Sequence, residues 1–278
     1  MIEFVKKLLG SAYLPVRSGI FWMYNRLSVV AFFLSGGVKR NRKKLEELRN
    51  SCAGKRCFVV CNGPSLRAED LTKIHEHGDI SIGMNAIARI YEHTPWRPTY
   101  LSLRDDIAFS KKNAEMCRTC ECEYRIYDRS RFLRTLNSEG ERFYLGFDES
   151  PRLLEEPTFD PEATKKMPSI GTSAYSCLEF AVFLGCREIY IIGCDLAYAV
   201  NITRDGRIYY NESGKEHFYE KKDEDMKTTD TEPNPTWQLQ VAFDTAAKYA
   251  KENGIKIYNA TRGGMLESFP RVDLEYLF

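Results

Sequence analysis

The sequence predicts an α/β fold with a mostly parallel sheet and helices on both faces. Residues Cys57–Cys61 are apolar at every position, as in a strand covered on both sides. Glu188–Asp195 reads EIYIIGCD and is apolar and β-branched up to Gly193. Strand and helix patterns alternate along the chain, which is the order typical of a parallel sheet.

Residues 1–50 differ from the rest and are expected to form an amphipathic membrane-surface segment and linker. The apolar run Gly19–Leu34 contains Asn25 and Arg26, and is too short to cross about 30 Å of hydrocarbon comfortably. The basic residues nearby favour an interfacial helix pair, while packing on the main domain or on a second subunit is the alternative. Residues 39–51 are expected to form a charged helical connector with a solvated face.

Residues 51–278 are expected to form one nucleotide-binding domain in which residues 199–234 are a lid loop. Pro-rich and acidic residues predict a surface loop or lid over 146–168. Thr172 or Ser173 is expected to cap a helix that Gly185 ends. The other expected elements are strands at 79–85, 99–106 and 255–259, weaker strands at 124–127 and 143–145, and a helix from Asn234 and Pro235 to about 252.

The composition argues against nucleic acid as a partner, because 40 Lys and Arg balance 39 Asp and Glu. Nine cysteines, an odd number, without a secretory signal pattern are expected to be reduced thiols in a cytoplasmic protein. Cys117, Cys120 and Cys122 form CxxCxC, but no second cysteine pair or histidine cluster follows at zinc-finger spacing. A metal at that motif is therefore disfavoured.

The segment that follows the first strand, Asn62, Gly63, Pro64 and Ser65, is expected to be a tight turn leading into a helix. Gly63 lets the backbone approach a ligand, Pro64 fixes φ, and Ser65 can cap the helix, which would leave outward N–H groups for an anion. The turn lacks the glycine pattern of dinucleotide-binding loops and the lysine of the Walker motif. An ordinary structural turn is the alternative.

Polar residues follow several of the predicted strands. In parallel sheets, ligands bind outside the carboxyl ends of the strands, so these residues are site candidates, although about half are expected to be structural. Together with the helix start at Gly171, Thr172 and Ser173, they form a set of groups suited to a nucleotide. The strand-end residues are Asn62, Asn85, Asp105, Asp106, Gly193, Asp195 and Asn259.

At these motifs the chain resembles the bacterial CMP-sialic acid-dependent sialyltransferases. The resemblance rests on NGPSL at 62–66, GMN at 83–85, the stretch 169–198 and His217. The closing stretch 256–278 is more similar to a sister domain, found in 6-hydroxymethylpterin diphosphokinase-like and motility-associated flagellin glycosylation proteins. The resemblance covers roughly residues 55–278.

The resemblance implies a GT-A-like variant fold and an inverting transfer that needs no metal. It implies that His217 is the general base and that Tyr198 contacts the leaving phosphate. A second phosphate tyrosine cannot be placed, since Tyr209 and Tyr210 lie too far along the chain from Tyr198. The resemblance also implies that Asn62, Gly63 and Ser65 hold the nucleotide phosphate and ribose, that Asn85 meets the cytidine side, and that Thr172 and Ser173 line the donor pocket. The other residues predicted for this site are Pro64, Asp105, Gly171 and Asp195, although Asp105 is more acidic than a site that needs no metal requires.

The preferred hypothesis is a glycosyltransferase that transfers a sialic acid or related nonulosonate from a CMP-sugar to a bacterial surface glycan. It would need no cofactor, would use a glycan or lipid-linked acceptor, and would lie on the inner face of the cytoplasmic membrane; a homo-oligomer is left open. The first alternative is a Mg²⁺-dependent 6-hydroxymethylpterin diphosphokinase-like enzyme with Asp105 and Asp106 as metal ligands. The second is a non-catalytic nucleotide-binding or scaffold domain, in which His217 is only a loop residue.

Overall fold

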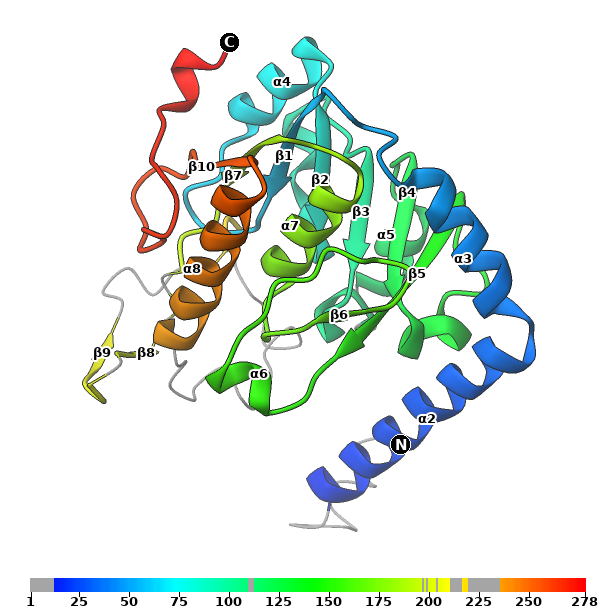
Figure 1. Cartoon of the computed structure of the whole chain (residues 1–278). Coiled ribbons are helices and arrows are strands. Elements are labelled where there is room, and N and C mark those ends of the chain that lie inside the picture. Colours follow the sequence, from blue (N-terminus) through cyan, green and yellow to red (C-terminus); the bar gives the residue numbers. More distant parts are fainter. Residues whose placement is uncertain are drawn as a thin grey trace.

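A single parallel sheet of eight strands forms the centre of the computed structural model (Figure 1), with the strand order β10-β7-β1-β2-β3-β4-β5-β6. The structure describes residues 13–109, 113–196, 198, 200–203, 205–210, 217–219 and 236–278. Every neighbouring pair in this sheet is parallel, which confirms the predicted fold class. The strands are β1 (Arg56–Val60), β2 (Ile80–Met84), β3 (Tyr100–Leu103), β4 (Tyr124–Asp128), β5 (Glu141–Asp148), β6 (Lys166–Pro168), β7 (Glu188–Ile192) and β10 (Lys256–Asn259).

Helices cover both faces of the sheet because successive strand residues point to opposite faces and most of them are apolar. One face, with Val59 and Ile191, packs against α7 and α8, which lie in front of the sheet in Figure 1. The other face, with Phe58 and Tyr190, packs against α4, η2 and the C-terminal residues. The helices are α2 (Tyr13–Leu34), α3 (Gly37–Leu48), α4 (Ala68–His77), α5 (Asn113–Thr119), α6 (Arg152–Glu155), α7 (Ser173–Phe183) and α8 (Thr236–Glu252), with 3₁₀ turns η2 (Asn85–His93), η3 (Asp106–Phe109), η4 (Arg129–Arg134) and η6 (Leu274–Tyr276).

The direction of strand addition reverses between β1 and β7. From β1 the chain adds β2 to β6 on one side, and then returns to place β7 and β10 on the other. Cys61 and Gly63 extend the contact beyond the strands, donating N–H groups to the carbonyls of Ile192 (2.9 Å) and Gly193 (2.8 Å). Such a switch point opens a crevice at the carboxyl ends of the strands, where ligands of α/β proteins bind.

Of the two N-terminal helices, α3 packs on the edge of β5 and α2 packs mainly against η4. The Asn41 side chain accepts a hydrogen bond from the Tyr144 N–H (2.7 Å) and donates one to the Tyr144 carbonyl (2.8 Å). Leu45 is fully buried, so the expectation that residues 39–51 are a solvated connector is wrong for one side of α3. Asn41 instead pairs the backbone of β5 where β6 does not reach it, which protects an open strand edge. In the part of the chain that the structure describes, no helix is long and apolar enough to cross a membrane.

The segment 146–168 is more regular than a surface loop. It contains the end of β5, the short helix α6 and the edge strand β6. β6 pairs Lys166–Pro168 with Gly146–Asp148, so the segment turns back onto the strand from which it started. Three-residue strands carry too little periodicity to be recognised from the sequence.

A two-stranded antiparallel hairpin lies apart from the main sheet. β8 (Val200–Ile202) pairs with β9 (Ile208–Tyr210) within the region predicted as a lid. Most of the remaining lid, and the Asn234 and Pro235 start signal of α8, lie outside the described residues.

Candidate functional site

The turn after β1 is closed by the protein itself. The Gly63 N–H donates to Gly193, the Leu66 N–H to the Gly63 carbonyl, and the Ser65 N–H to Asp195 Oδ2 (3.4 Å). The expectation of outward N–H groups is therefore wrong at these three positions. Ser65 does not cap a helix either, because α4 begins three residues later, at Ala68.

Asp195 occupies the position that an anion was expected to take. Its Oδ2 accepts the Ser65 hydroxyl hydrogen bond at 2.8 Å, and its side chain is buried. Burial raises the pKa of this carboxyl, and the Ser65 hydrogen bonds oppose that rise. Asp195 thus joins the ends of β1 and β7, and in the structure Ser65 and Asp195 bind each other.

The side-chain oxygen of Asn62 is available to accept a hydrogen bond from a ligand. Its Nδ2 donates to the Met84 carbonyl at 3.0 Å, while its buried Oδ1 has no hydrogen-bond partner among the described residues. Its backbone carbonyl accepts a hydrogen bond from the Phe218 N–H at 2.9 Å. A buried unpaired acceptor is costly unless a ligand donates to it, so Asn62 Oδ1 is a binding candidate.

Asn85 connects three elements at the carboxyl edge. Its backbone adopts φ +50°, and its Oδ1 accepts hydrogen bonds from the N–H groups of Arg104 (3.2 Å) and Asp105 (3.1 Å). Its Nδ2 donates to the Ser173 hydroxyl at 3.3 Å. Asparagine tolerates the left-handed region better than most residues, which explains how the chain turns here directly from β2 into η2.

The start of α7 follows the prediction. Thr172 is the N-cap and its hydroxyl accepts from the Ala174 N–H at 3.4 Å, while Gly185, at φ +88°, follows the end of the helix. Gly171 has φ +82°, and a Cβ there would meet nothing within 4 Å. Ser173 faces Asn85, so the helix start and the end of β2 belong to one polar network.

Arg104, the residue after β3, was not among the predicted site residues. Its Nη1 donates to the Ser176 hydroxyl (2.6 Å) and its Nη2 to the Ser169 hydroxyl (3.0 Å). Its guanidinium lies 3.6 Å from the ring centre of Phe147. The sequence signal was a basic residue directly after the apolar run YLSL, but the two following carboxylates drew the interpretation towards metal binding.

His217 precedes Phe218, whose N–H connects the loop after β9 to Asn62 in the turn after β1. Its ring stacks on Tyr219 with centroids 4.9 Å apart, and the Arg89 guanidinium lies 4.3 Å from the Tyr219 ring centre. Because Phe218 bonds to Asn62, His217 is brought beside the carboxyl end of β1. Tyr198 is half-buried against the core on the α7 side.

The remaining candidates divide between structural and untested roles. Asn259 is structural, since its Nδ2 donates to the Leu266 carbonyl (2.7 Å) and its Oδ1 accepts the Thr261 N–H (2.9 Å). The side chains of Asp106 and Tyr209 lie outside what the structure describes. Among the described residues no group of three or more His, Cys, Asp or Glu side chains is arranged to hold a metal ion, and Cys117, Cys120 and Cys122 are free thiols.

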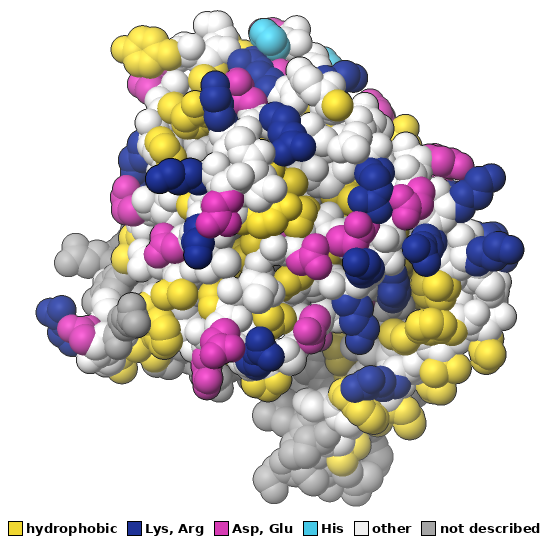
Figure 2. Space-filling view, in the orientation of Figure 1, with side chains coloured by type: hydrophobic (Ala, Val, Ile, Leu, Met, Phe, Trp, Pro, Cys, Tyr) yellow, Lys and Arg dark blue, Asp and Glu magenta, His cyan; other side chains and the backbone are white. Residues whose placement is uncertain are grey.

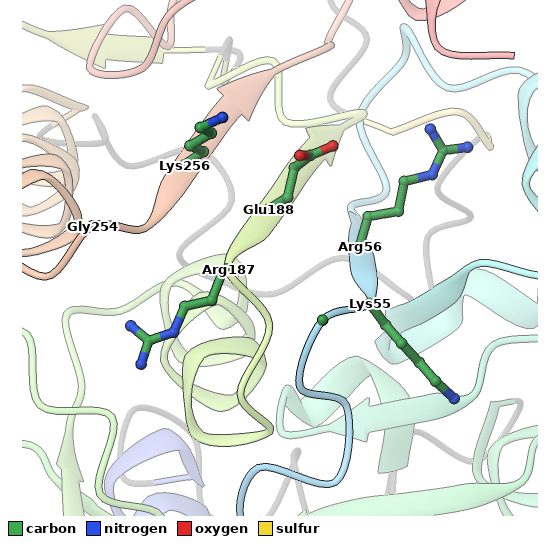
Figure 3. A pocket seen from close by; sticks show the side chains of 7 residues that line it. Lys55, Arg56, Arg187, Glu188, Gly254 and Lys256 are labelled. Atoms are coloured by element: carbon green, nitrogen blue, oxygen red, sulfur yellow. The ribbon is translucent and has the colours of Figure 1, made fainter.

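A hollow lies at the amino ends of the strands, opposite to the carboxyl ends where the polar strand-end residues lie. It is lined where β1, β7 and β10 begin, by Gly54, Lys55, Arg56, Arg187, Glu188, Gly254 and Lys256. In Figure 3 the side chains of Lys55, Arg187 and Lys256 point in different directions and do not converge. Because it lies where these strands begin, the hollow is separate from the polar residues that follow the strands.

The chain matches no family model, and no curated protein matches its sequence. Solved structures similar to it include two glycosyltransferases. The MAf glycosyltransferase from Magnetospirillum magneticum AMB-1 has 15% identity and a TM-score of 0.49, with 87% of this chain and 39% of that chain covered. The sialyltransferase CstII from Campylobacter jejuni, in complex with cytidine-5'-monophosphate, has 14% identity and a TM-score of 0.44, with 79% and 85% covered. This chain thus spans well under half of the first protein, and likenesses at this level say nothing about substrate.

Proposed function

We propose that the protein is a glycosyltransferase that moves an acidic sugar of the nonulosonate class from a CMP donor to a glycan or lipid-linked acceptor. The observation that carries the proposal is the hydrogen bond from the Phe218 N–H to the Asn62 carbonyl, because it brings His217 to the strand-end site. Asn62, Asn85 and Ser173 supply neutral donors and acceptors suited to a nucleoside. The choice of CMP rests on the motif resemblance.

In this proposal the acceptor hydroxyl attacks the anomeric carbon of the donor. His217 takes the hydroxyl proton as the new C–O bond forms, and imidazole titrates in the range that suits such a base. The bond from the anomeric carbon to the phosphate oxygen breaks, and its electron pair leaves with CMP. Tyr198 donates a hydrogen bond to the departing phosphate and stabilises its charge.

The test is CMP release from CMP-N-acetylneuraminate in the presence of a panel of glycan acceptors. We expect His217→Ala to lower kcat by about 10²-fold or more with little change in the Kd for CMP, as for loss of a general base. His93→Ala, at an exposed position on η2, is the matched control and should turn over like the wild type. Near-wild-type turnover of His217→Ala would refute His217 as the base.

Asp105 favours a second candidate function, that of a Mg²⁺-dependent diphosphokinase. Its N–H bonds to Asn85 Oδ1 at 3.1 Å, so its backbone belongs to the same edge of the sheet. Stabilisation of the protein by ATP with Mg²⁺, and not by CMP in EDTA, would favour this candidate.

The proposed location is the inner face of the cytoplasmic membrane, held there by α2 and α3. Figure 2 shows hydrophobic side chains exposed over α2, with Lys and Arg side chains gathered beside them over α3. Trp22 is 61% exposed and Leu27 is 54% exposed, whereas Phe32 on the same helix is buried against the domain. An apolar helix face next to a basic one suits an interface with anionic lipids.

Flotation with anionic and neutral liposomes tests this location. Trp22→Ser combined with Leu27→Ser should reduce binding to anionic vesicles, and both sites are exposed enough to leave folding intact. Leu136→Ser, at a 50% exposed leucine beyond η4, is the matched control. Equal flotation of the double variant and the control would refute the membrane role of α2.

A further inference from the structure

The guanidinium of Arg104 is held rigidly in a buried polar site. The side chain is only 11% exposed, its two terminal nitrogens donate to Ser176 and Ser169, and its plane lies against Phe147. A guanidinium has five N–H groups, and these two hydrogen bonds use two of them. The buried Nε has no partner among the described residues.

Acidic groups near Arg104 offset its charge only in part. Asp128 and Glu179 favour the charged form of Arg104. Oε1 of Glu149 lies 3.6 Å from Nη2 of Arg104, but that side chain is 69% exposed and water screens it. Ser176 lies in the first turn of α7, so the cation sits beside the positive end of a helix dipole. Burial lowers the pKa of Arg104, and this effect outweighs the opposite effect of the nearby carboxylates. A buried cation and the positive end of a helix dipole both favour a bound anion.

Arg104 also belongs to the nucleotide network. Its backbone N–H donates to Asn85 Oδ1, and the same asparagine donates to Ser173, three residues before Ser176 on α7. An anion at the guanidinium would therefore lie beside a ligand held by Asn85 and Ser173. The rigid planar fork of arginine matches the planar carboxylate best, although it binds phosphate as well.

We propose that Arg104, positioned by Ser169 and Ser176 at the start of α7, binds the carboxylate of the donor sugar and so selects acidic sugars. This inference rests on the proposed function and names the part of the donor that the site reads. A neutral sugar would leave the guanidinium without its anion.

Calorimetric titration of three ligands tests the inference: CMP, CMP-N-acetylneuraminate and the C1 methyl ester of that donor, which lacks the carboxylate charge. We expect the wild type to bind the free acid about 10-fold or more tightly than the ester, as for loss of a hydrogen bond to a charged group. Arg104→Gln should lose this preference while its Kd for CMP stays within about 2-fold, and Arg104→Lys should keep part of the preference.

Arg129→Gln is the matched control. Arg129 follows β4, its Nε is also unpartnered among the described residues, and burial also lowers its pKa, but its guanidinium packs near Gly146 and Phe32 rather than bonding to Ser169 and Ser176. It should keep the acid preference. Melting curves recorded with each titration show whether a variant is folded.

Three results would overturn the inference. Equal binding of acid and ester by the wild type would show that no carboxylate subsite exists, whether or not any variant folds. A preference retained in Arg104→Gln would exclude Arg104 as the partner. A comparable loss of CMP binding in Arg104→Gln would assign the guanidinium to the phosphate. Failure of the wild type to bind CMP at all would instead refute the proposed function.

Discussion

The Asp195 carboxylate fills the space where a side chain at residue 63 would lie. A Cβ at Gly63 would overlap Asp195 Oδ2 and would come within 2.5 Å of the Gly193 carbonyl oxygen. The same carboxylate oxygen accepts the Ser65 hydroxyl and N–H. The glycine after β1 is therefore required by the end of β7, and the two strand ends form one rigid unit under the site.

Gly63→Ala should lower the unfolding free energy by about 1–3 kcal/mol, because the added methyl overpacks this contact. Denaturant unfolding measures the change. Gly63→Ala combined with Asp195→Ala should be less destabilised than the sum of the two single variants, since removal of the carboxylate makes room. Strict additivity of the two changes would contradict the contact.

Substitutions of Asn85 should separate the stability cost of its left-handed backbone from the contribution of its side chain to CMP binding. Asn85→Gly keeps the φ +50° backbone without strain, whereas Asn85→Ala must place a Cβ there, so we expect the alanine variant to be about 1 kcal/mol less stable. Both variants lose the side-chain links to Arg104, Asp105 and Ser173, and both should bind CMP weakly. Unfolding and titration of the two variants measure the two effects, and equal stability would refute the strain.

Asn41→Ala should destabilise the protein by about 2 kcal/mol, because it leaves the N–H and carbonyl of Tyr144 unpaired in a buried position. Arg42→Ala, at the neighbouring exposed position of α3, is the control and should change stability little. Thermal unfolding compares the two. A similar small effect at both positions would show that α3 is not needed to cover the edge of β5.

Strands β1 and β7 could be predicted because burial on both faces makes them short apolar runs bounded by turn residues. The Thr172 cap and the Gly185 helix end were also predicted, since both signals are local in the sequence. The role of Ser65 could not be, because its partner Asp195 is 130 residues away in the sequence. The local sequence pattern predicted that Ser65 caps a helix, but its hydroxyl instead donates a hydrogen bond to Asp195.

Glu162 should contribute stability that acid removes. Hydrogen bonds from Arg49, and then from Thr164, lower the pKa of Glu162 to about 2. A depressed pKa in the folded state stabilises the protein above the unfolded pKa, and this contribution is lost as the pH falls towards 2. Glu162→Gln should therefore be about 1 kcal/mol less stable than the wild type at pH 7, with the gap closing between about pH 5 and pH 2.

Denaturant unfolding from pH 2 to pH 7 follows the gap. Glu156→Gln is the control, because its ion pair with Arg152 joins two side chains that are more than 70% exposed. A gap between wild type and Glu162→Gln that does not depend on pH would contradict the assignment.

The central claim is that the carboxyl edge of this sheet binds CMP without a metal. Isothermal titration of the protein with CMP in EDTA tests it most directly, with Asn85→Gly beside the wild type because that variant keeps an unstrained backbone. The account predicts saturable binding at one site per chain in the wild type and weaker binding in the variant. No binding of CMP in EDTA, together with saturable binding of ATP and Mg²⁺, would contradict it.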